Sequence, residues 1–219
     1  MSTLTQQPVA SLLQRLFHEA EASSANPIFS SISGDELDRL MHSKTDYQDF
    51  YTRLKDLPLA VSPATGTLLY MLARSCRAQH IVEFGTSFGI STLHLAAALR
   101  DNGGGRLITS EFEASKVDKA RAHLREGGLL DLVEIRQGDA LQTLAVDLPE
   151  RIDLVLLDGA KALYPEILGL LEDRLRPGAL IIADNADYSP EYLQRVRAVE
   201  NGYLSIPFAE DVELSMRLI

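Results

Sequence analysis

The stretch His80-Ile-Val-Glu-Phe-Gly-Thr-Ser-Phe-Gly-Ile-Ser91 decides the fold of this chain. Its first five residues are a short apolar run that predicts a strand, and residues 91–99 repeat apolar side chains at helical spacing. Gly85 and Gly89 lie between the two, where glycine permits a tight turn and lets a ligand approach the backbone closely. The spacing is not GxGxxG, so the turn disfavours a pyrophosphate cofactor.

Strand-like and helix-like runs alternate outward from this turn. Strands are predicted at 80–84, 106–110, 132–136, 152–157 and 179–183, and helices at 91–99, 114–126, 140–146, 164–175 and 190–199. This alternation predicts a Rossmann-like, doubly wound α/β fold around a mostly parallel sheet. Two more strand-like runs, 203–206 and 212–219, are joined by a short connection containing Pro207. They bring the sheet to seven strands and predict an antiparallel C-terminal edge strand.

The start of the chain lacks this alternation. Apolar residues in the first sixty positions recur at helical spacing, so residues 1–57 are predicted to form a helical cap and residues 58–219 the Rossmann-like core. A length of 219 residues fits a single domain with one sizeable core.

The composition narrows the class of protein. A formal net charge of −10 argues against binding to nucleic acid or to an anionic membrane, because both need a basic surface. The N-terminus has no basic start followed by an apolar run, and no apolar stretch approaches the length of a membrane-spanning helix. Cys76 is the one cysteine, which fits a reducing compartment. The cytoplasm is the expected location.

Acidic residues follow the second and third predicted strands, where ligands bind in such sheets. Glu111 comes 28 residues after Glu83, about one βαβ unit, and its carboxylate can accept both hydroxyls of a ribose. A solvated acid is an equally good reading of Glu111 alone. Asp139 follows the third strand and can either cap the next helix, the better reading of this residue by itself, or bond an adenine amino group.

Two further acidic motifs follow the next two strands, as Asp158-Gly-Ala-Lys161 and Asp184-Asn185. Carboxylate and amide oxygens are the ligands that Mg²⁺ prefers, whereas zinc would need Cys or His at a spacing that is absent here. Asp at a strand end and Asp-Asn in a turn are each common without any ligand. Their occurrence in successive βα turns favours a metal site.

The segments Val61-Ser-Pro-Ala-Thr-Gly66, Val82 to Ser91 and Gly138-Asp139 resemble the class I methyltransferases, and within them the catechol and caffeoyl-CoA O-methyltransferases. The resemblance covers roughly residues 56–219. It implies S-adenosylmethionine as cofactor. The residues that would bind it are Val61, Gly66, Glu83, Gly85, Ser91, Glu111, Asp139, Ala140 and Asp158.

The same resemblance implies roles around the substrate. Asp158, Asp184 and Asn185 would bind a divalent cation, with Mg²⁺ expected, and Asp158 would share in catalysis with Lys161 as general base. The substrate would contact Lys161, Asn185 and Glu213, although Glu213 fits a solvated strand residue equally well.

Two departures from the family bear on the substrate pocket. Gly159 and Ala160 replace larger residues, which predicts a wider pocket. Because the chain has no Trp, an aromatic wall would come from residues such as Phe88, Tyr188 or Phe208.

The resulting hypothesis is metal-dependent methyl transfer from S-adenosylmethionine to a hydroxyl of a small catechol-like, ortho-dihydroxy aromatic substrate, by a homodimer. Two alternatives stay open at this point. One is metal-independent methylation of another small-molecule hydroxyl, in which the two Asp serve structure. The other is a non-catalytic cofactor-binding module.

Overall fold

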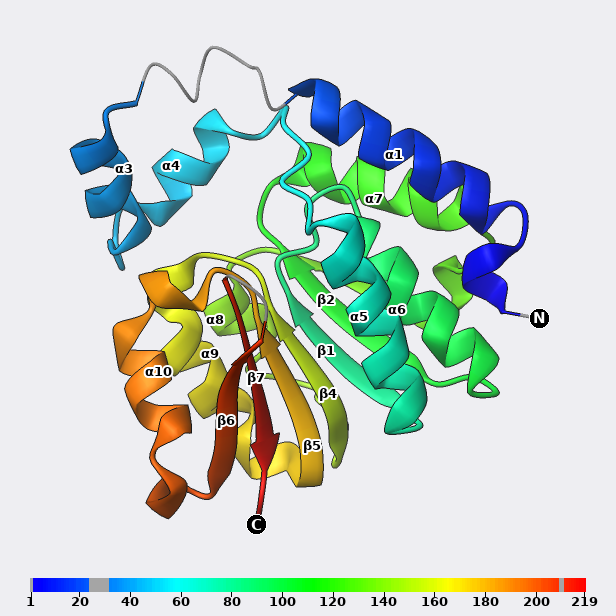
Figure 1. The fold of residues 1–219 in the computed structure, drawn as a ribbon. Helices are drawn as coiled ribbons and strands as arrows, with labels where there is room; N and C mark the ends of the chain where they lie inside the picture. Colours follow the sequence, from blue (N-terminus) through cyan, green and yellow to red (C-terminus); the bar gives the residue numbers. More distant parts are fainter. Residues whose placement is uncertain (1, 24–31, 209–210) are drawn as a thin grey trace.

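The computed structural model describes residues 2–23, 32–208 and 211–219. Its centre is a seven-stranded sheet in the order β3-β2-β1-β4-β5-β7-β6 (Figure 1). The strands are β1 (His80–Phe84), β2 (Arg106–Glu111), β3 (Val133–Gln137), β4 (Ile152–Leu157), β5 (Leu175–Ala183), β6 (Tyr203–Phe208) and β7 (Val212–Arg217). The first five strands pair in parallel, and β7 runs antiparallel to β5 and to β6.

The predicted doubly wound, mostly parallel sheet with an antiparallel C-terminal strand is confirmed, with two refinements. The antiparallel strand β7 lies between β5 and β6, so β6 forms the edge of the sheet. Pro207 was expected in the connection but lies within β6, opposite Glu213. An edge strand tolerates proline because its outer side needs no N–H donor.

Helices cover both faces of the sheet, as the two buried clusters show. Apolar side chains from α1, α5, α6 and α7 pack on one face, and those from α8, α9 and α10 pack on the other. The bounds of these helices are α1 (Val9–Ser23), α5 (Pro63–Ser75), α6 (Ile90–Asp101), α7 (Ala114–Glu126), α8 (Ala140–Thr143), α9 (Tyr164–Leu171) and α10 (Pro190–Arg197). No helix among the described residues is long and apolar enough to cross a membrane.

Two short helices, α3 (Gly34–Met41) and α4 (Tyr47–Arg53), lie beyond the end of the sheet where β1 to β5 finish (Figure 1). They share a small buried cluster of their own that includes Leu40, Phe50 and Leu54. Lys44, in the turn between them, forms ion pairs of 2.8 Å with both Glu166 of α9 and Glu191 of α10. This pair of helices therefore faces the end of the sheet at which ligands bind in such folds.

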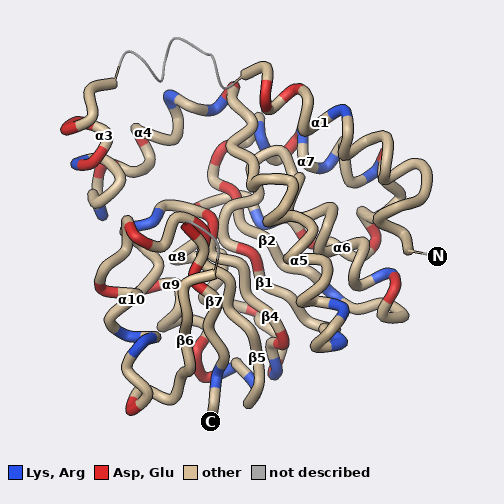
Figure 2. The backbone as a smooth tube through the Cα atoms, viewed as in Figure 1, with Lys and Arg blue, Asp and Glu red and all other residues tan. Residues whose placement is uncertain are grey.

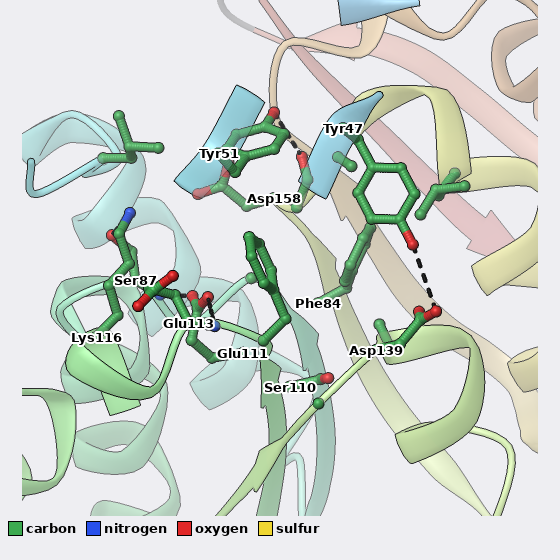
Figure 3. A pocket seen from close by; sticks show the side chains of 18 residues that line it. Tyr47, Tyr51, Phe84, Ser87, Ser110, Glu111, Glu113, Lys116, Asp139 and Asp158 are labelled. Carbon is green, nitrogen blue, oxygen red and sulfur yellow. Dashed lines mark hydrogen bonds between the residues drawn. The ribbon is translucent and has the colours of Figure 1, made fainter. Parts of the chain in front are cut away.

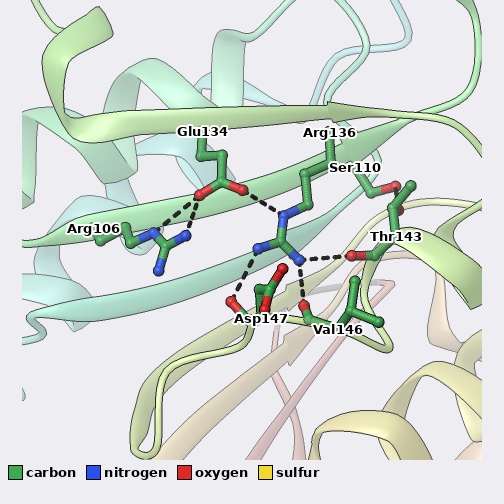
Figure 4. A network of polar contacts seen from close by, with 7 residues as sticks. All are labelled: Arg106, Ser110, Glu134, Arg136, Thr143, Val146 and Asp147. Atoms are coloured by element: carbon green, nitrogen blue, oxygen red, sulfur yellow. Dashed lines mark hydrogen bonds and ion pairs between the residues drawn. The ribbon is translucent and has the colours of Figure 1, made fainter.

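Arg136 fixes the segment that follows β3 (Figure 4). Its guanidinium donates to the backbone oxygens of Thr143 at 2.7 Å, Val146 at 2.6 Å and Asp147 at 3.0 Å, and it pairs with Glu134 at 2.7 Å. These bonds satisfy carbonyl groups that the end of a short helix leaves without partners. The C-terminal end of α8 and the segment that follows it are thereby held against β3.

Glu83 joins the first strand to the helix after it. Its side chain is fully buried, and its two oxygens accept hydrogen bonds of 2.6 Å from Ser91 Oγ and Thr92 Oγ1 in the first turn of α6. Burial raises the pKa of the Glu83 carboxyl from 4.5 to about 7. Between pH 4.5 and about 7, the folded protein therefore keeps a proton on Glu83 that the unfolded chain releases.

We predict that Glu83→Gln stabilises the protein at alkaline pH. A raised pKa stabilises the fold fully only below the unfolded value, and that stability is lost as the pH rises through about 7. The neutral amide avoids this loss, so the free energy of unfolding should rise by on the order of 2 kcal/mol at pH 8.5 and hardly change at pH 4.5. Urea unfolding at the two pH values measures this. An equal change at both would show that the charge of Glu83 is not the cause.

Candidate functional site

A pocket opens at the carboxyl ends of β1, β2 and β4, with α4 above it (Figure 3). Of the residues predicted to bind a cofactor, five line this pocket. They are Gly85, Glu111, Asp139, Ala140 and Asp158. Several Asp and Glu positions, red in Figure 2, lie along the backbone at this end of the sheet.

The glycine turn lets the backbone of β1 come close to that of β4. Gly85 has a φ of 101°, and a Cβ there would lie 2.5 Å from the backbone oxygen of Asp158. The backbone N–H of Asp158 in turn donates to Phe84 O at 2.8 Å. Any larger residue at position 85 would therefore push apart the two strand ends that form the floor of the pocket.

Glu111 ends β2 with its carboxylate held by the backbone. Its Oε2 accepts from Ser87 N at 2.9 Å and its Oε1 accepts from Glu113 N at 3.0 Å. Burial raises the pKa of this carboxyl, while the two N–H groups and the charge of Lys116 lower it. The carboxylate faces the pocket and has lone pairs left for further donors.

Asp139 combines two functions that its sequence position left open. Its Oδ1 accepts from Leu141 N at 2.9 Å and so caps α8. Its Oδ2 lies 3.4 Å from the hydroxyl of Tyr47 and lines the pocket. Asp139 therefore caps α8 through Oδ1, and its Oδ2 lies on the side of the pocket.

Four of the predicted cofactor residues lie outside the walls of this pocket. Glu83 is buried beneath the turn and supports Ser91, which lines a small hollow beside the pocket. Val61 is packed in the core. A Cβ at Gly66 would lie 2.7 Å from the imidazole of His94, so this glycine permits close packing of α5 on α6. Leu59, two residues before Val61, lines both the pocket and the hollow instead.

Asp158, Lys161 and Asp184 form a cluster next to the pocket. The register of β4 and β5 pairs Leu157 with Ala183, so Asp158 and Asp184 leave neighbouring strands at the same level. Lys161 Nζ lies 2.8 Å from Oδ1 of Asp158 and 3.9 Å from Oδ2 of Asp184. All three side chains are at most 14% exposed, and Asp158 is the one that lines the pocket.

The pKa values of both Asp184 and Lys161 are raised in this cluster. Burial raises the pKa of the Asp184 carboxyl to about 8, and the neighbouring charges of Asp158 and Asp211 add to the shift. Burial alone would lower the pKa of the Lys161 ammonium, but Asp158 and Asp184 raise it well above its usual value. Lys161 therefore holds its proton firmly while both carboxylates face it.

Asn185 and Asp211 complete this side of the site. Asn185 Nδ2 donates to Asp211 Oδ2 at 2.9 Å, which leaves the amide oxygen of Asn185 free to act as a ligand. Asp211 was not predicted, although it lies two residues before Glu213 in the same acidic run. In the described part of the chain, no group of three or more His, Cys, Asp and Glu side chains has an arrangement suited to a metal ion.

Glu213 does not face the substrate side, and its predicted contact with substrate is wrong. It is 1% exposed on β7, where Arg197 of α10 donates to its two oxygens at 2.8 and 2.7 Å. Ser205 Oγ adds a bond of 2.6 Å. The alternation of side chains along β7 turns residue 213 toward α10, so it is neither a substrate ligand nor a solvated residue.

The aromatic side of the pocket is formed by two tyrosines of α4, in the region predicted to be a helical cap. Tyr47 and Tyr51, one turn apart on α4, both line the pocket, and Tyr51 Oη lies 3.5 Å from Gly159 O. The four-residue spacing of Tyr47 and Tyr51, which places both on one face of a helix, is the sequence feature that could have predicted this. The residues expected to form an aromatic wall lie elsewhere: Phe88 lies beneath Lys119, Tyr188 packs at a tilt against His42, and Phe208 is 40% exposed.

Gly159 does not widen the pocket as predicted. A Cβ at Gly159 would lie 2.4 Å from the Phe84 ring, which occupies the space that a larger residue would need. Phe84 itself lines the pocket and packs edge-on against Tyr164. The small residue therefore accommodates an aromatic side chain from β1.

Comparisons with known proteins agree on one family. A family model described as a methyltransferase domain matches residues 82–186. The chain is 38% identical over 130 residues to a catechol O-methyltransferase of Niastella koreensis and 34% identical over 131 residues to one of Mycobacterium tuberculosis. These matches cover 58% and 59% of this chain, and the chain spans 58% and 59% of the length of those relatives.

A solved structure extends the similarity to nearly the whole chain. It is the O-methyltransferase TomG from Streptomyces achromogenes in complex with S-adenosylmethionine, with a TM-score of 0.66 and 27% identity over 94% of this chain and 99% of that one. The sheet order, the glycine turn after β1 and the acid after β2 are consistent with these matches. The chain is therefore similar to S-adenosylmethionine-dependent methyltransferases, and within them to O-methyltransferases.

Proposed function

We propose that this protein transfers a methyl group from S-adenosylmethionine to a hydroxyl of a small catechol-like substrate, with a divalent cation, Mg²⁺ expected, as a second cofactor. The observation that carries the proposal is the cluster of Asp158, Asp184 and Lys161 directly beside the pocket. Relatives named catechol O-methyltransferase support the substrate class.

The donor set fits a hard cation. Asp158 and Asp184 offer carboxylate oxygens, Asn185 offers an amide oxygen, and Asp211 adds negative charge beside them. Like charges held together in a buried place are unfavourable by themselves, as the raised pKa of Asp184 indicates. When bound, a divalent cation would relieve this repulsion, hold a substrate hydroxyl and lower the pKa of that hydroxyl.

In this proposal, the remaining residues of the pocket bind and orient S-adenosylmethionine. In the proposed complex, Glu111 accepts the ribose hydroxyls and Asp139 accepts from the adenine amino group, which their positions in the pocket lining support, and Gly85 lets the cofactor approach the backbone closely. Tyr47, Tyr51 and Leu163 cover the pocket and exclude water.

The transfer itself needs one proton acceptor. The substrate oxygen attacks the methyl carbon in line with the carbon–sulfur bond, whose electron pair stays on sulfur to give S-adenosylhomocysteine. The hydroxyl proton goes to Nζ of Lys161, which must first be neutral. Burial favours the neutral amine once the carboxylates that raise its pKa are engaged elsewhere.

Two alternatives make different predictions for the same cluster. In metal-independent methylation, Asp158 and Asp184 would serve structure by holding Lys161. In a cofactor-binding module, the pocket would bind S-adenosylmethionine without any transfer.

We expect turnover of a catechol, followed as methylated product by mass spectrometry, to stop in excess EDTA and to return when Mg²⁺ is added. The reason is that the donor set holds only oxygen ligands, which prefer such an ion. Undiminished turnover in EDTA would favour the metal-independent alternative, and cofactor binding without product from any catechol tested would favour the module.

A matched pair of variants separates the two halves of the site. Asp184→Asn should lower turnover by more than about 100-fold while the Kd for S-adenosylhomocysteine changes little, because Asp184 belongs to the proposed metal side and, unlike Asp158, does not line the pocket. Glu111→Gln should weaken S-adenosylhomocysteine binding first. Equal losses of cofactor affinity in both variants would contradict this division.

The tyrosine wall offers a test of its own. We expect Tyr47→Phe to weaken S-adenosylhomocysteine binding about 2- to 10-fold, because one hydrogen bond to Asp139 at the adenine end is removed. Isothermal titration measures the change. Tyr188→Phe is the matched control, since Tyr188 packs against His42 outside the pocket, and an equal effect there would argue against a role of Tyr47.

We further propose a homodimer located in the cytoplasm. The sheet edge carries Leu204, Ile206, Phe208 and Met216 on one face, with exposed fractions of 53, 57, 40 and 40%. Apolar surface of this kind is a common place for a second subunit. Sedimentation equilibrium should give twice the chain mass of 24.1 kDa, and Ile206→Lys should shift it toward the monomer. A monomeric wild type would contradict the proposal.

A further inference from the structure

Lys116 is a buried cation in the wall of the pocket that the proposed reaction does not use. It lies in the first turn of α7 with 3% of its surface exposed. Figure 3 shows it beside Ser87, on the same side of the pocket as Glu111 and Glu113. A buried ammonium is unfavourable unless it forms ion pairs or hydrogen bonds with neighbouring groups, so the groups around Lys116 determine its role.

Ser87 connects Lys116 to Glu111. Lys116 Nζ lies 3.4 Å from Ser87 Oγ, while the backbone N–H of the same serine donates to Glu111 Oε2 at 2.9 Å. Ser87 has a φ of 47°, a conformation that is uncommon for residues other than glycine. A contact on each side of this serine favours that conformation and keeps its N–H directed at the carboxylate.

We propose that Lys116 is a positioning residue for Glu111: through Ser87 and through its own charge, it keeps this carboxylate ionised and oriented to accept the two neighbouring hydroxyls of a ribose. The inference rests on the proposed function, because it concerns the cofactor end of that site.

The electrostatic surroundings agree with this role. Burial raises the pKa of Glu111, and Glu113 adds to the rise, whereas Lys116 and the two backbone N–H groups oppose it. Burial lowers the pKa of Lys116, as does Lys119, whereas the charges of Glu111, Glu113 and Asp158 raise it. Without Lys116, Glu111 should keep its proton to a higher pH and lose acceptor strength there.

The test is the pH dependence of S-adenosylhomocysteine binding to the full-length protein, by isothermal titration between pH 6 and 8.5. Relative to wild type, Lys116→Met should raise the Kd by a factor that grows as the pH falls from 8.5 to 6, with a limit of about tenfold for each unit by which the pKa of Glu111 rises. Lys116→Arg, which keeps the charge, should restore most of the affinity at pH 6.

Controls separate this effect from general loss of structure. Lys119→Met removes one charge from the same helix, where Lys119 lies over the Phe88 ring, and should leave the pH profile unchanged. Ser87→Gly keeps the backbone conformation and removes Oγ, so it should reproduce part of the Lys116→Met effect. It also provides a second readout if Lys116→Met fails to fold.

The possible outcomes distinguish the proposed function from the role of Lys116. Wild type that does not bind S-adenosylhomocysteine would overturn the proposed function itself. Wild type that binds, together with a Lys116→Met profile parallel to it at every pH, would overturn the role of Lys116 alone. A pH-independent loss shared with Lys116→Arg would assign Lys116 a direct contact with the cofactor and would also overturn the positioning role.

Discussion

The site depends on one constraint, the side-by-side placement of two carboxylates at the ends of β4 and β5. The parallel register pairs Leu157 with Ala183, and Asp184 N donates to Leu157 O at 2.9 Å. Asp158 and Asp184, which follow these strands directly, are therefore held close together. Burial and, after it, the charge of Asp158 raise the pKa of Asp184 to about 8, while Lys161 opposes this rise. Replacing a buried charged cluster with apolar residues is often neutral or stabilising, so we attribute this cluster to the proposed metal ion rather than to the stability of the fold.

The rest of the structure serves this placement and the pocket beside it. α9 and α10 bury the strand ends from one side, and the Tyr164 hydroxyl donates to Asp184 O at 2.8 Å. On the other side of the pocket, Glu83 joins β1 to α6 beneath the glycine turn, while Arg136 holds the segment behind Asp139. α3 and α4 lie over the opening with their own small core and two ion pairs through Lys44. The residues that we propose to bind the cofactor, to accept the proton and to hold the metal ion thereby lie at one end of the sheet.

The alternation of strands and helices predicted the sheet because buried parallel strands have continuous apolar runs that periodicity detects. The same logic predicted residues that directly follow strands, such as Gly85, Glu111 and Asp158, since the topology alone brings strand ends together. It failed for Glu213, because a side chain within a strand faces one side or the other according to a register that the sequence leaves open. It also missed Tyr47 and Tyr51, whose contact with the pocket depends on how the cap docks. Val61 and Gly66 show that a motif can mark packing as well as contact with a ligand.

The most direct test of the account is a crystal structure of the protein with S-adenosylhomocysteine and Mn²⁺, a redox-silent substitute for Mg²⁺ under these conditions with a measurable anomalous signal. The account predicts one anomalous peak at about 2.1 Å from oxygens of Asp158, Asp184 and Asn185, next to the sulfur of the bound cofactor. Bound S-adenosylhomocysteine with no peak there, or with the Lys161 ammonium still between the two carboxylates at saturating Mn²⁺, would contradict it.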